Sequence, residues 1–308
     1  MPFPAVRVKT NPAYAMNHRQ TIMQLLYPFP LLKATFSHGQ DQHPLAEEVA
    51  SRLAERMADM RRGFGTVLDL GSGTASMAAS LAQAGVTPDT LIHADLVSGN
   101  LHHPLSVALN AEHPLPFANG TFDAVISNLM LHWINDVPQT LMHIGRALKP
   151  DGLFLASTFG NDSFIELKTA FAESGSRHAH TIPFTDVQSA GAALQKVGYA
   201  MPVVDRDVIT VTYKDFAALY TDMRLAGSRN LHPARSRGLM TPRQLRRMED
   251  AYRTNFARPD GTLPVTLEIL YLHGWRPHTS QQKPLKPGSA TVSLDEVLKT
   301  LPPRSQKD

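Results

Sequence analysis

The sequence predicts an α/β protein with a Rossmann-like, mostly parallel sheet of seven strands, helices on both faces and a helical insertion before the last strand. Short apolar strands alternate with helical segments in the first half, as in right-handed βαβ units. A glycine turn directly follows the first strand. Two longer strand patterns come near the end, with about fifty residues of mainly helical pattern between them.

The first helix is expected over residues 43–57, preceded by an N-terminal arm. Apolar residues recur in the helix at steps of four, as on one helical face: Leu45, Val49, Leu53 and Met57. Residues 1–40 contain no Asp or Glu, a composition shared with organelle-targeting peptides, but their prolines interrupt any long amphipathic helix. We interpret this segment as an arm that folds over the body.

Five short strands with two helices between them follow the first helix. The strands are expected at 66–70, 90–95, 104–109, 122–127 and 152–159, and the helices at 75–84 and 137–148. In parallel sheets of this kind, ligands bind outside the carboxyl ends of the strands. The sequence therefore places any binding site where these strands end.

The pattern changes in the second half. A helix is expected over 185–198, with Thr185 as its cap and a glycine at its end. Strands at 203–213 and 265–275 enclose two helical patterns, 215–227 and 241–256. The predicted division is an arm (1–40), a core (41–213), a basic helical insertion acting as a lid (214–258), the last strand with the completion of the core (259–293) and a frayed tail (294–308).

Composition limits the function classes. No apolar run reaches about 18 residues, so no membrane span is expected. The formal net charge of +3 is too small to argue for nucleic acid by itself. The absence of cysteine excludes disulfides and thiolate metal sites and is compatible with a reducing compartment. A bacterial cytoplasm is expected, with the mitochondrial matrix as the alternative.

The turn "VLDLGSGTAS" (67–76) indicates a ligand close to the backbone. Gly71 and Gly73 permit a tight turn, after which helical N–H groups point outward. The third glycine of a dinucleotide fingerprint is missing at its spacing, which disfavours NAD. Asp69 suits the amino and sulfonium groups of S-adenosyl-L-methionine better than a pyrophosphate, and Asp95 suits a ribose diol. The alternative is an ordinary strand-to-helix turn with an incidental Asp69.

The segment after the fourth strand supplies further candidates. Ser127, Asn128 and Leu129 follow that strand at the carboxyl edge of the sheet. His132 and Trp133 are the catalytic candidates, as lining of a substrate pocket. The alternatives are a packing role for Trp133 and a surface or core role for His132.

Several motifs together resemble the class I S-adenosylmethionine-dependent methyltransferases: "VLDLGSGTAS", "ADL", "LPFANGTFDAVISNLMLHWINDVP" and "LKPDGLFLASTFG". They are similar to the biotin-pathway malonyl-carrier-protein methyltransferases. The segment 260–293 resembles a mitochondrial complex I assembly factor family of the same fold, which is assigned as a protein-arginine hydroxylase. The resemblance covers most of residues 43–293 and implies the class I methyltransferase fold with S-adenosyl-L-methionine as cofactor.

The resemblance implies cofactor binding by Asp69, Gly71, Gly73 and Asp95. Together with the further candidates, the predicted cofactor-binding residues are Asp69, Gly71, Ser72, Gly73, Asp95, Leu96, Glu112, Asn128 and Leu129. Ala75 replaces the family's third glycine, and its methyl is expected to crowd the cofactor slightly. Ala111 stands where the family has an acid near the adenine, with Glu112 or Asn110 as possible substitutes.

The chemistry favours methyl transfer. An in-line displacement from a sulfonium needs mainly alignment and desolvation. A hydroxylase would need an oxidant, and the sequence lacks a pattern of two His and one carboxylate to hold iron. No metal is therefore expected. The predicted function is methyl transfer to a protein or carrier-protein-bound acceptor. The alternative is a complex I assembly factor that hydroxylates an arginine or acts as a chaperone.

The insertion concentrates positive charge. Residues 214–258 contain ten Lys or Arg and four Asp or Glu, a net charge of +6. One interpretation is a solvated helix face. The functional one is a lid whose basic face docks an acidic protein or carrier protein, including a subunit of respiratory complex I. Nucleic acid is disfavoured, because few aromatic residues lie among these charges.

Overall fold

The computed structural model describes residues 44–281 apart from 74, 99–100, 102, 177, 179, 226–229, 231–234, 236–237 and 239. The chain divides into two compact units, residues 1–277 and 278–308, and only 278–281 of the second are described. The predicted arm and tail therefore lie outside the described residues. No described helix combines the length and hydropathy needed to cross a bilayer.

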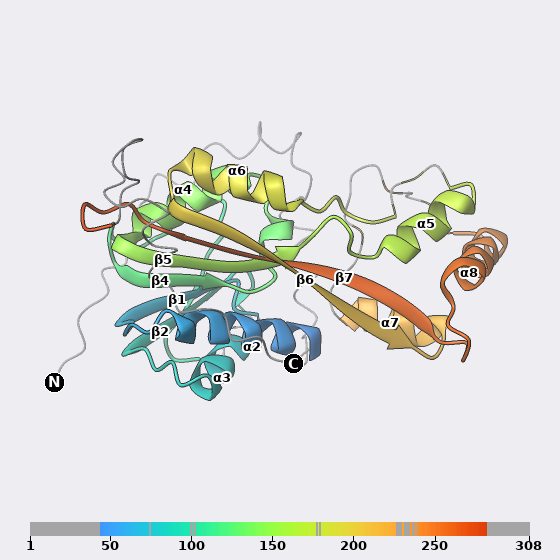
Figure 1. Ribbon diagram of the computed structural model, residues 1–308, viewed down its shortest axis with the longest axis horizontal. Helices are drawn as coiled ribbons and strands as arrows, with labels where there is room; N and C mark the ends of the chain where they lie inside the picture. The colour runs from blue at the N-terminus through green and yellow to red at the C-terminus, as the bar shows by residue number, and fades with distance from the viewer. Residues whose placement is uncertain are drawn as a thin grey trace, which may run out of the picture. The chain divides into compact units, whose positions relative to one another are not determined.

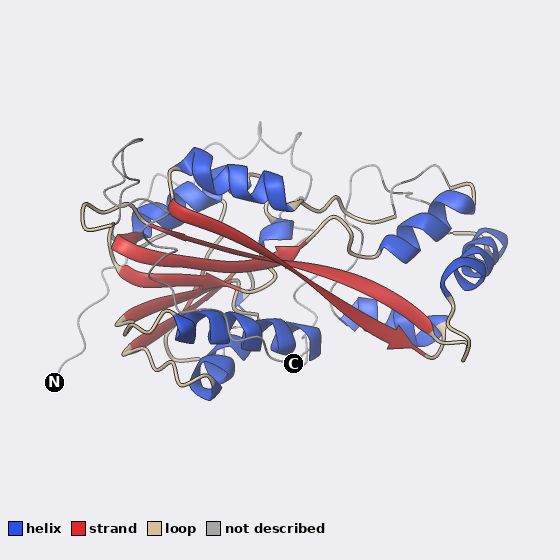
Figure 2. Ribbon diagram, in the orientation of Figure 1, coloured by secondary structure: helices blue, strands red, loops and turns tan. Residues whose placement is uncertain are grey.

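Seven strands form one sheet in the order β3-β2-β1-β4-β5-β7-β6 (Figure 2). Their bounds are β1 Thr66–Leu70, β2 Thr90–Asp95, β3 Ser106–Ala108, β4 Phe122–Ser127, β5 Leu148–Phe159, β6 Ala200–Tyr213 and β7 Leu263–Trp275. Strand β7 runs antiparallel to both β5 and β6, and all other neighbouring strands pair in parallel. The predicted seven-stranded, mostly parallel sheet is confirmed.

Helices cover both faces of the sheet, α2 and α3 on one and α4 and α6 on the other (Figure 1). Their bounds are α2 Pro44–Asp59, α3 Ser76–Gln83, α4 Val137–Ala147 and α6 Val187–Val197. Neighbouring residues of β1 face opposite sides, so Val67 packs in the first core and Leu68 in the second. Both are fully buried, which explains why the central strand is almost continuously apolar.

Side-chain caps fix where the helices begin. Asp136 accepts a hydrogen bond from the Gln139 amide at α4 (2.9 Å), and Asp186 accepts one from the Ser189 amide at α6 (2.7 Å). The predicted cap, Thr185, is thus wrong by one residue. The carboxylate of Asp186 reaches the amide three residues on, as an N-cap does. Gly198 ends α6 with φ 91°, a conformation that suits glycine.

One helix, α5 Ile165–Glu173, is absent from the sequence prediction. It begins at Phe164, whose φ is 59° and whose side chain gives no cap. The helix is instead anchored by β7: Glu166 accepts hydrogen bonds from the amide (3.0 Å) and hydroxyl (2.5 Å) of Thr266. Local sequence signals therefore did not reveal a helix that distant residues hold in place.

The insertion supplies two helices between β6 and β7, α7 Phe216–Leu225 and α8 Pro242–Phe256. With α5, they gather around one end of the long β6–β7 pair (Figure 1). Tyr252 of α8 is fully buried and donates a hydrogen bond to the carbonyl of Pro264 on β7 (2.5 Å). The helical insertion before the last strand is thus confirmed.

Candidate functional site

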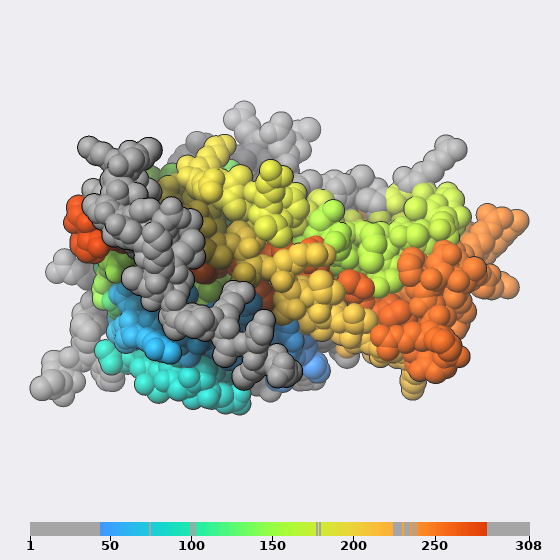
Figure 3. All heavy atoms as spheres, in the orientation of Figure 1, coloured from blue at the N-terminus to red at the C-terminus, as the bar shows by residue number. Residues whose placement is uncertain are grey.

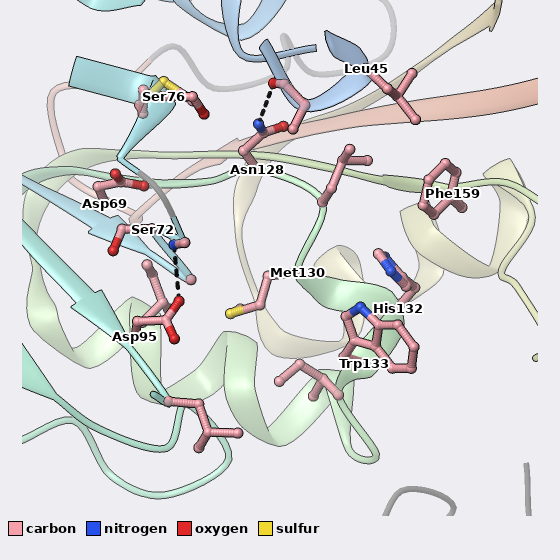
Figure 4. Close-up of a pocket in the computed structure, with 18 of the residues that line it drawn as sticks. Leu45, Asp69, Ser72, Ser76, Asp95, Asn128, Met130, His132, Trp133 and Phe159 are labelled. Carbon is pink, nitrogen blue, oxygen red and sulfur yellow. Dashed lines mark hydrogen bonds between the residues drawn. The ribbon is translucent and has the colours of Figure 1, made fainter. Parts of the chain in front are cut away.

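A cavity of about 650 Å³ lies where β1, β2 and β4 end, and every predicted cofactor-binding and catalytic residue lines it. The further candidate Ser127 does not line it, because its buried hydroxyl donates to the carbonyl of Leu70 (2.9 Å). The glycine turn follows β1, and Asp95 ends β2. Asn128 follows β4 directly, and His132 lies in the short 3-10 helix η4 Leu131–Trp133. Figure 4 shows these side chains around one space. The carboxyl ends of the parallel strands bring them together, as predicted from the strand order.

The two glycines of the turn have different surroundings, so glycine is present at the two positions for different structural reasons. Both have positive φ, 76° at Gly71 and 49° at Gly73. A Cβ on Gly71 would lie 2.7–2.8 Å from the Met130 side chain, so the turn has no room for a larger residue there. A Cβ on Gly73 would meet no atom within 4 Å. Gly71 is thus needed for packing, whereas Gly73 leaves open space beside the cavity.

Asp95 braces the glycine turn. One carboxylate oxygen accepts a hydrogen bond from the Gly73 amide (2.9 Å), and the other accepts one from the Val97 amide (2.8 Å). The first of these is drawn in Figure 4. Each carboxylate oxygen can accept a further bond. Asp95 can therefore hold the turn and still receive a diol, and Leu96 beside it lines the same cavity.

Asp69 has a partner that the sequence analysis missed. Asp69 and His93 are each 1% exposed, and Oδ2 of Asp69 lies 3.0 Å from Nδ1 of His93. Burial raises the pKa of Asp69 above its usual value, and the hydrogen bond from His93 offsets part of that rise. The other oxygen, Oδ1, and the Ser72 hydroxyl are buried without a hydrogen-bond partner. A usable signal was that His93 stands two residues before Asp95, on the same face of a strand.

Of the two departures from the family pattern, Ala111 lines the cavity and Ala75 is not among the described lining residues. Ala75 precedes α3 with φ 61°, a left-handed conformation that costs about 1–2 kcal/mol for a residue with a Cβ. Ala111 is buried in the cavity wall. Glu112 lines the cavity and accepts hydrogen bonds from the amide (2.5 Å) and side chain (2.9 Å) of Asn135. Asn110 lines it too, with its side-chain oxygen bound to the Glu112 amide (3.0 Å).

The amide of Asn128 joins three parts of the structure. Its nitrogen donates to the carbonyl of Ala46 in α2 (2.8 Å), drawn in Figure 4, and its oxygen accepts from Ser157 (2.8 Å). The Ser157 hydroxyl also accepts from the amide of Leu129, whose φ is 50°. These bonds fix the loop after β4 against the cavity.

Aromatic rings enclose the predicted catalytic pair at the other end of the cavity. The His132 ring centroid lies 5.1 Å from Trp133, 4.9 Å from Phe159 and 6.1 Å from Phe184. Burial lowers the pKa of His132 to about 3, and its Nδ1 has no hydrogen-bond partner. At neutral pH the imidazole is therefore uncharged.

The second half of the chain contributes residues that sequence reasoning missed. Asp222 and Met223 of α7 line the cavity, as does Tyr213, whose hydroxyl donates to Asp222 (2.5 Å). Five acids stand among the described lining residues, with no Lys or Arg: Glu48, Asp69, Asp95, Glu112 and Asp222. Glu48 is paired with Arg52, one turn along α2. No local motif marks Tyr213 or Asp222, because only the fold brings them to the cavity.

Comparisons with known proteins agree with this geometry. Residues 40–202 match a family model described as a methyltransferase domain. The chain is 36% identical over 83% of its length to arginine-hydroxylase NDUFAF5 of Danio rerio, covering 82% of that protein. It is 34% identical over 75% of its length to malonyl-[acyl-carrier protein] O-methyltransferase of Halorhodospira halophila, covering 81%. A presumed methyltransferase of Bacillus halodurans shares the fold at 15% identity and TM-score 0.50, over 73% of this chain and 99% of that one.

Proposed function

This chain belongs to the methyltransferase domain family, and from that premise we propose an enzyme that uses S-adenosyl-L-methionine and acts on a protein-borne acceptor. The observation that carries the proposal is one cavity with two unlike ends. The glycine turn, Asp69 and Asp95 form one end. The rings around His132 form the other, where an acceptor group would lie beside the cofactor.

The described residues fit a cofactor that carries positive charge. The free oxygen of Asp69 and the Ser72 hydroxyl are buried polar atoms without partners, each costing about 1–3 kcal/mol unless a ligand binds it. We assign Asp69 to the cationic amino-acid part, Asp95 to the ribose hydroxyls, and the segment from Asn110 to Glu112 to the adenine end. When bound, the cofactor supplies an electrophilic methyl group.

The chain's own part in the reaction is positioning and exclusion of water. The rings of Trp133, Phe159 and Phe164 make the acceptor end apolar, which favours close alignment of the reacting groups. With a pKa of about 3, His132 is a weak base at neutral pH. We therefore assign His132 to hydrogen bonding with the acceptor and Trp133 to the wall that orients it.

The charge of the cavity favours an arginine side chain as the acceptor. A free carboxylate, as on a malonyl thioester, would face Asp222 with no Lys or Arg among the described lining residues to pair with it. A guanidinium would instead pair with Asp222 and lie against aromatic faces. The relatives named arginine-hydroxylase support this class of acceptor and raise hydroxylation as the second candidate reaction.

Mass spectrometry of the acceptor tests the proposal. The purified protein with S-adenosyl-L-methionine would be given an arginine-containing peptide or a carrier-bound malonyl thioester. We expect S-adenosylhomocysteine to accumulate with the peptide, which gains one methylene. A gain of one oxygen would replace methyl transfer by hydroxylation. Reaction of the malonyl thioester alone would overturn the arginine assignment, and stable capture of an unmodified protein would favour a chaperone.

Asp222→Asn is expected to raise the KM for the arginine peptide about tenfold and leave cofactor affinity unchanged. The amide oxygen of Asn still accepts the hydrogen bond of Tyr213, so the variant removes mainly the charge. A charged hydrogen bond contributes roughly 1.5–3 kcal/mol, which sets this magnitude. Steady-state kinetics measure it, with Asp250→Asn on the exposed side of α8 as control. An unchanged KM would remove Asp222 from the acceptor site.

We further propose that the basic insertion steers an acidic partner, with a complex I subunit or a carrier protein as the candidates. Helix α8 lies on the surface in Figure 3, and Arg243, Arg246 and Arg247 are exposed. They are not among the described lining residues, so they act outside the cavity. The mitochondrial relatives support a mitochondrial matrix setting as the alternative to a bacterial cytoplasm.

Reversal of Arg243, Arg246 and Arg247 to Glu is expected to slow partner association about tenfold at low salt and to flatten its salt dependence. Surface charges act on association rate and are screened over about 8–10 Å at physiological salt. Stopped-flow association measures the effect, and calorimetry should give the same cofactor affinity. Lys196→Glu, on the exposed side of α6, is the control. Equal rates for both variants would mean that the partner docks elsewhere.

A further inference from the structure

The buried pair of Asp69 and His93 lies directly beneath the cofactor end of the cavity. The two residues are register partners on β1 and β2 and lie side by side in the sheet. Each is 1% exposed, and their side chains meet at 3.0 Å. Asp69 lines the cavity, whereas His93 is not among its lining residues. The histidine therefore reaches a ligand only through the carboxylate.

The hydrogen-bond partners around the pair indicate which ring nitrogen of His93 carries the proton. Nε2 of His93 is buried without a hydrogen-bond partner, so a proton there would be unpaired. A single proton on Nδ1 is satisfied, because it is donated to Oδ2 of Asp69. This leaves Oδ1, which no group among the described residues binds, as the acceptor available to a ligand.

Within the described part of the chain, few other charged groups lie near the pair. Asp95, at the end of β2, repels the charge of Asp69, and the ring of His103 lies 4.7 Å from that of His93. The register partner of Asp69 on β4 is the apolar Ile126, and α3 contributes Ser76 and Met77 to the same cavity. His93 is thus the polar group that offsets the burial of Asp69.

We propose that His93 is a positioning residue that keeps Asp69 ionised and presents its free oxygen to a cationic group of the bound cofactor. The inference rests on the proposed cofactor, and it adds a residue that acts through another. Without the Nδ1–H donor, burial would favour the protonated, neutral carboxyl. The site would then lose its charge while the glycine turn and the ribose end stayed intact.

The test compares two probes by calorimetry across pH. S-adenosyl-L-methionine carries the cationic part, and 5′-methylthioadenosine keeps the nucleoside but lacks the amino-acid part. His93→Leu should weaken the binding of S-adenosyl-L-methionine about tenfold at neutral pH, in line with loss of a charged hydrogen bond. The affinity for methylthioadenosine should stay unchanged. His93→Gln, whose side-chain amide can donate to Asp69, should restore most of the affinity.

The pH profile separates this role from a merely structural one. A cation binds the ionised form of Asp69, so affinity falls as pH falls through the pKa of that carboxyl. Loss of His93 raises this pKa, so the fall should begin about one pH unit higher in His93→Leu. Asp69→Asn should abolish the profile, and adding His93→Leu to it should change nothing further.

Three outcomes would overturn the inference: equal weakening of both probes by His93→Leu, an unmoved pH profile, or additive effects in the double variant. Urea unfolding shows whether each variant is folded. If His93→Leu does not fold, His93→Gln provides the test by itself. If the wild-type protein binds neither probe, the proposed cofactor fails first. If it binds both and His93→Leu behaves as wild type, only the role of His93 fails.

Discussion

Gly71→Ala should destabilise the protein by about 2–5 kcal/mol. The φ of 76° alone costs an L-residue with a Cβ about 1–2 kcal/mol. The new methyl would also stand 2.7–2.8 Å from Met130, and such overpacking costs about 1–3 kcal/mol. Urea unfolding followed by circular dichroism measures the loss.

Gly73→Ala is the matched control, two residues along the same turn. Its φ is also positive, but its added methyl meets no atom within 4 Å. We expect about 1 kcal/mol of strain and, because the methyl stands beside the cavity, a drop in cofactor affinity. Adding Met130→Ala to Gly71→Ala should relieve only part of the clash, because it removes the Cγ and Sδ contacts but leaves the Cβ of residue 130 at 2.8 Å. Equal stability of the two single variants would contradict the packing role of Gly71.

Asp95→Ala should weaken cofactor binding about ten- to a hundredfold. A hydrogen bond involving a charged group contributes roughly 1.5–3 kcal/mol, and the variant removes the proposed ribose acceptor. It also leaves the Gly73 and Val97 amides without that acceptor, so the turn itself should loosen. We therefore expect a stability loss of about 1–3 kcal/mol beside the affinity loss. Calorimetry and urea unfolding measure the two effects.

Asp95→Asn separates those two effects. Its amide oxygen can still accept one of the two backbone bonds, so stability should fall less than in Asp95→Ala, while the charge is lost in both. Cofactor affinity should then fall in both variants, because both lose the charge. Stability should fall more in Asp95→Ala, which keeps no acceptor for the backbone amides. An unchanged dissociation constant in both variants would place the ribose elsewhere in the cavity.

The sequence by itself determined the fold and the position of the end of the cavity that is proposed to bind the cofactor. Alternating strands and helices predict the parallel sheet, and residues at the ends of its strands share one edge whatever the packing details. Asp69, Asp95 and Asn128 could be placed there because each lies in the last two residues of a recognisable strand or directly after it. His132 could be placed near them because it follows β4 by a few residues.

Only the tertiary structure decided which groups meet. The pairing of His93 with Asp69 depends on the register of β1 against β2, and the need for Gly71 depends on Met130. The end of the cavity proposed for the acceptor includes Asp222 from α7, more than a hundred residues along the chain from the glycine turn. Local patterns report the conformation of the segment that carries them. Contacts between distant segments depend on how the whole core packs, which no local pattern records.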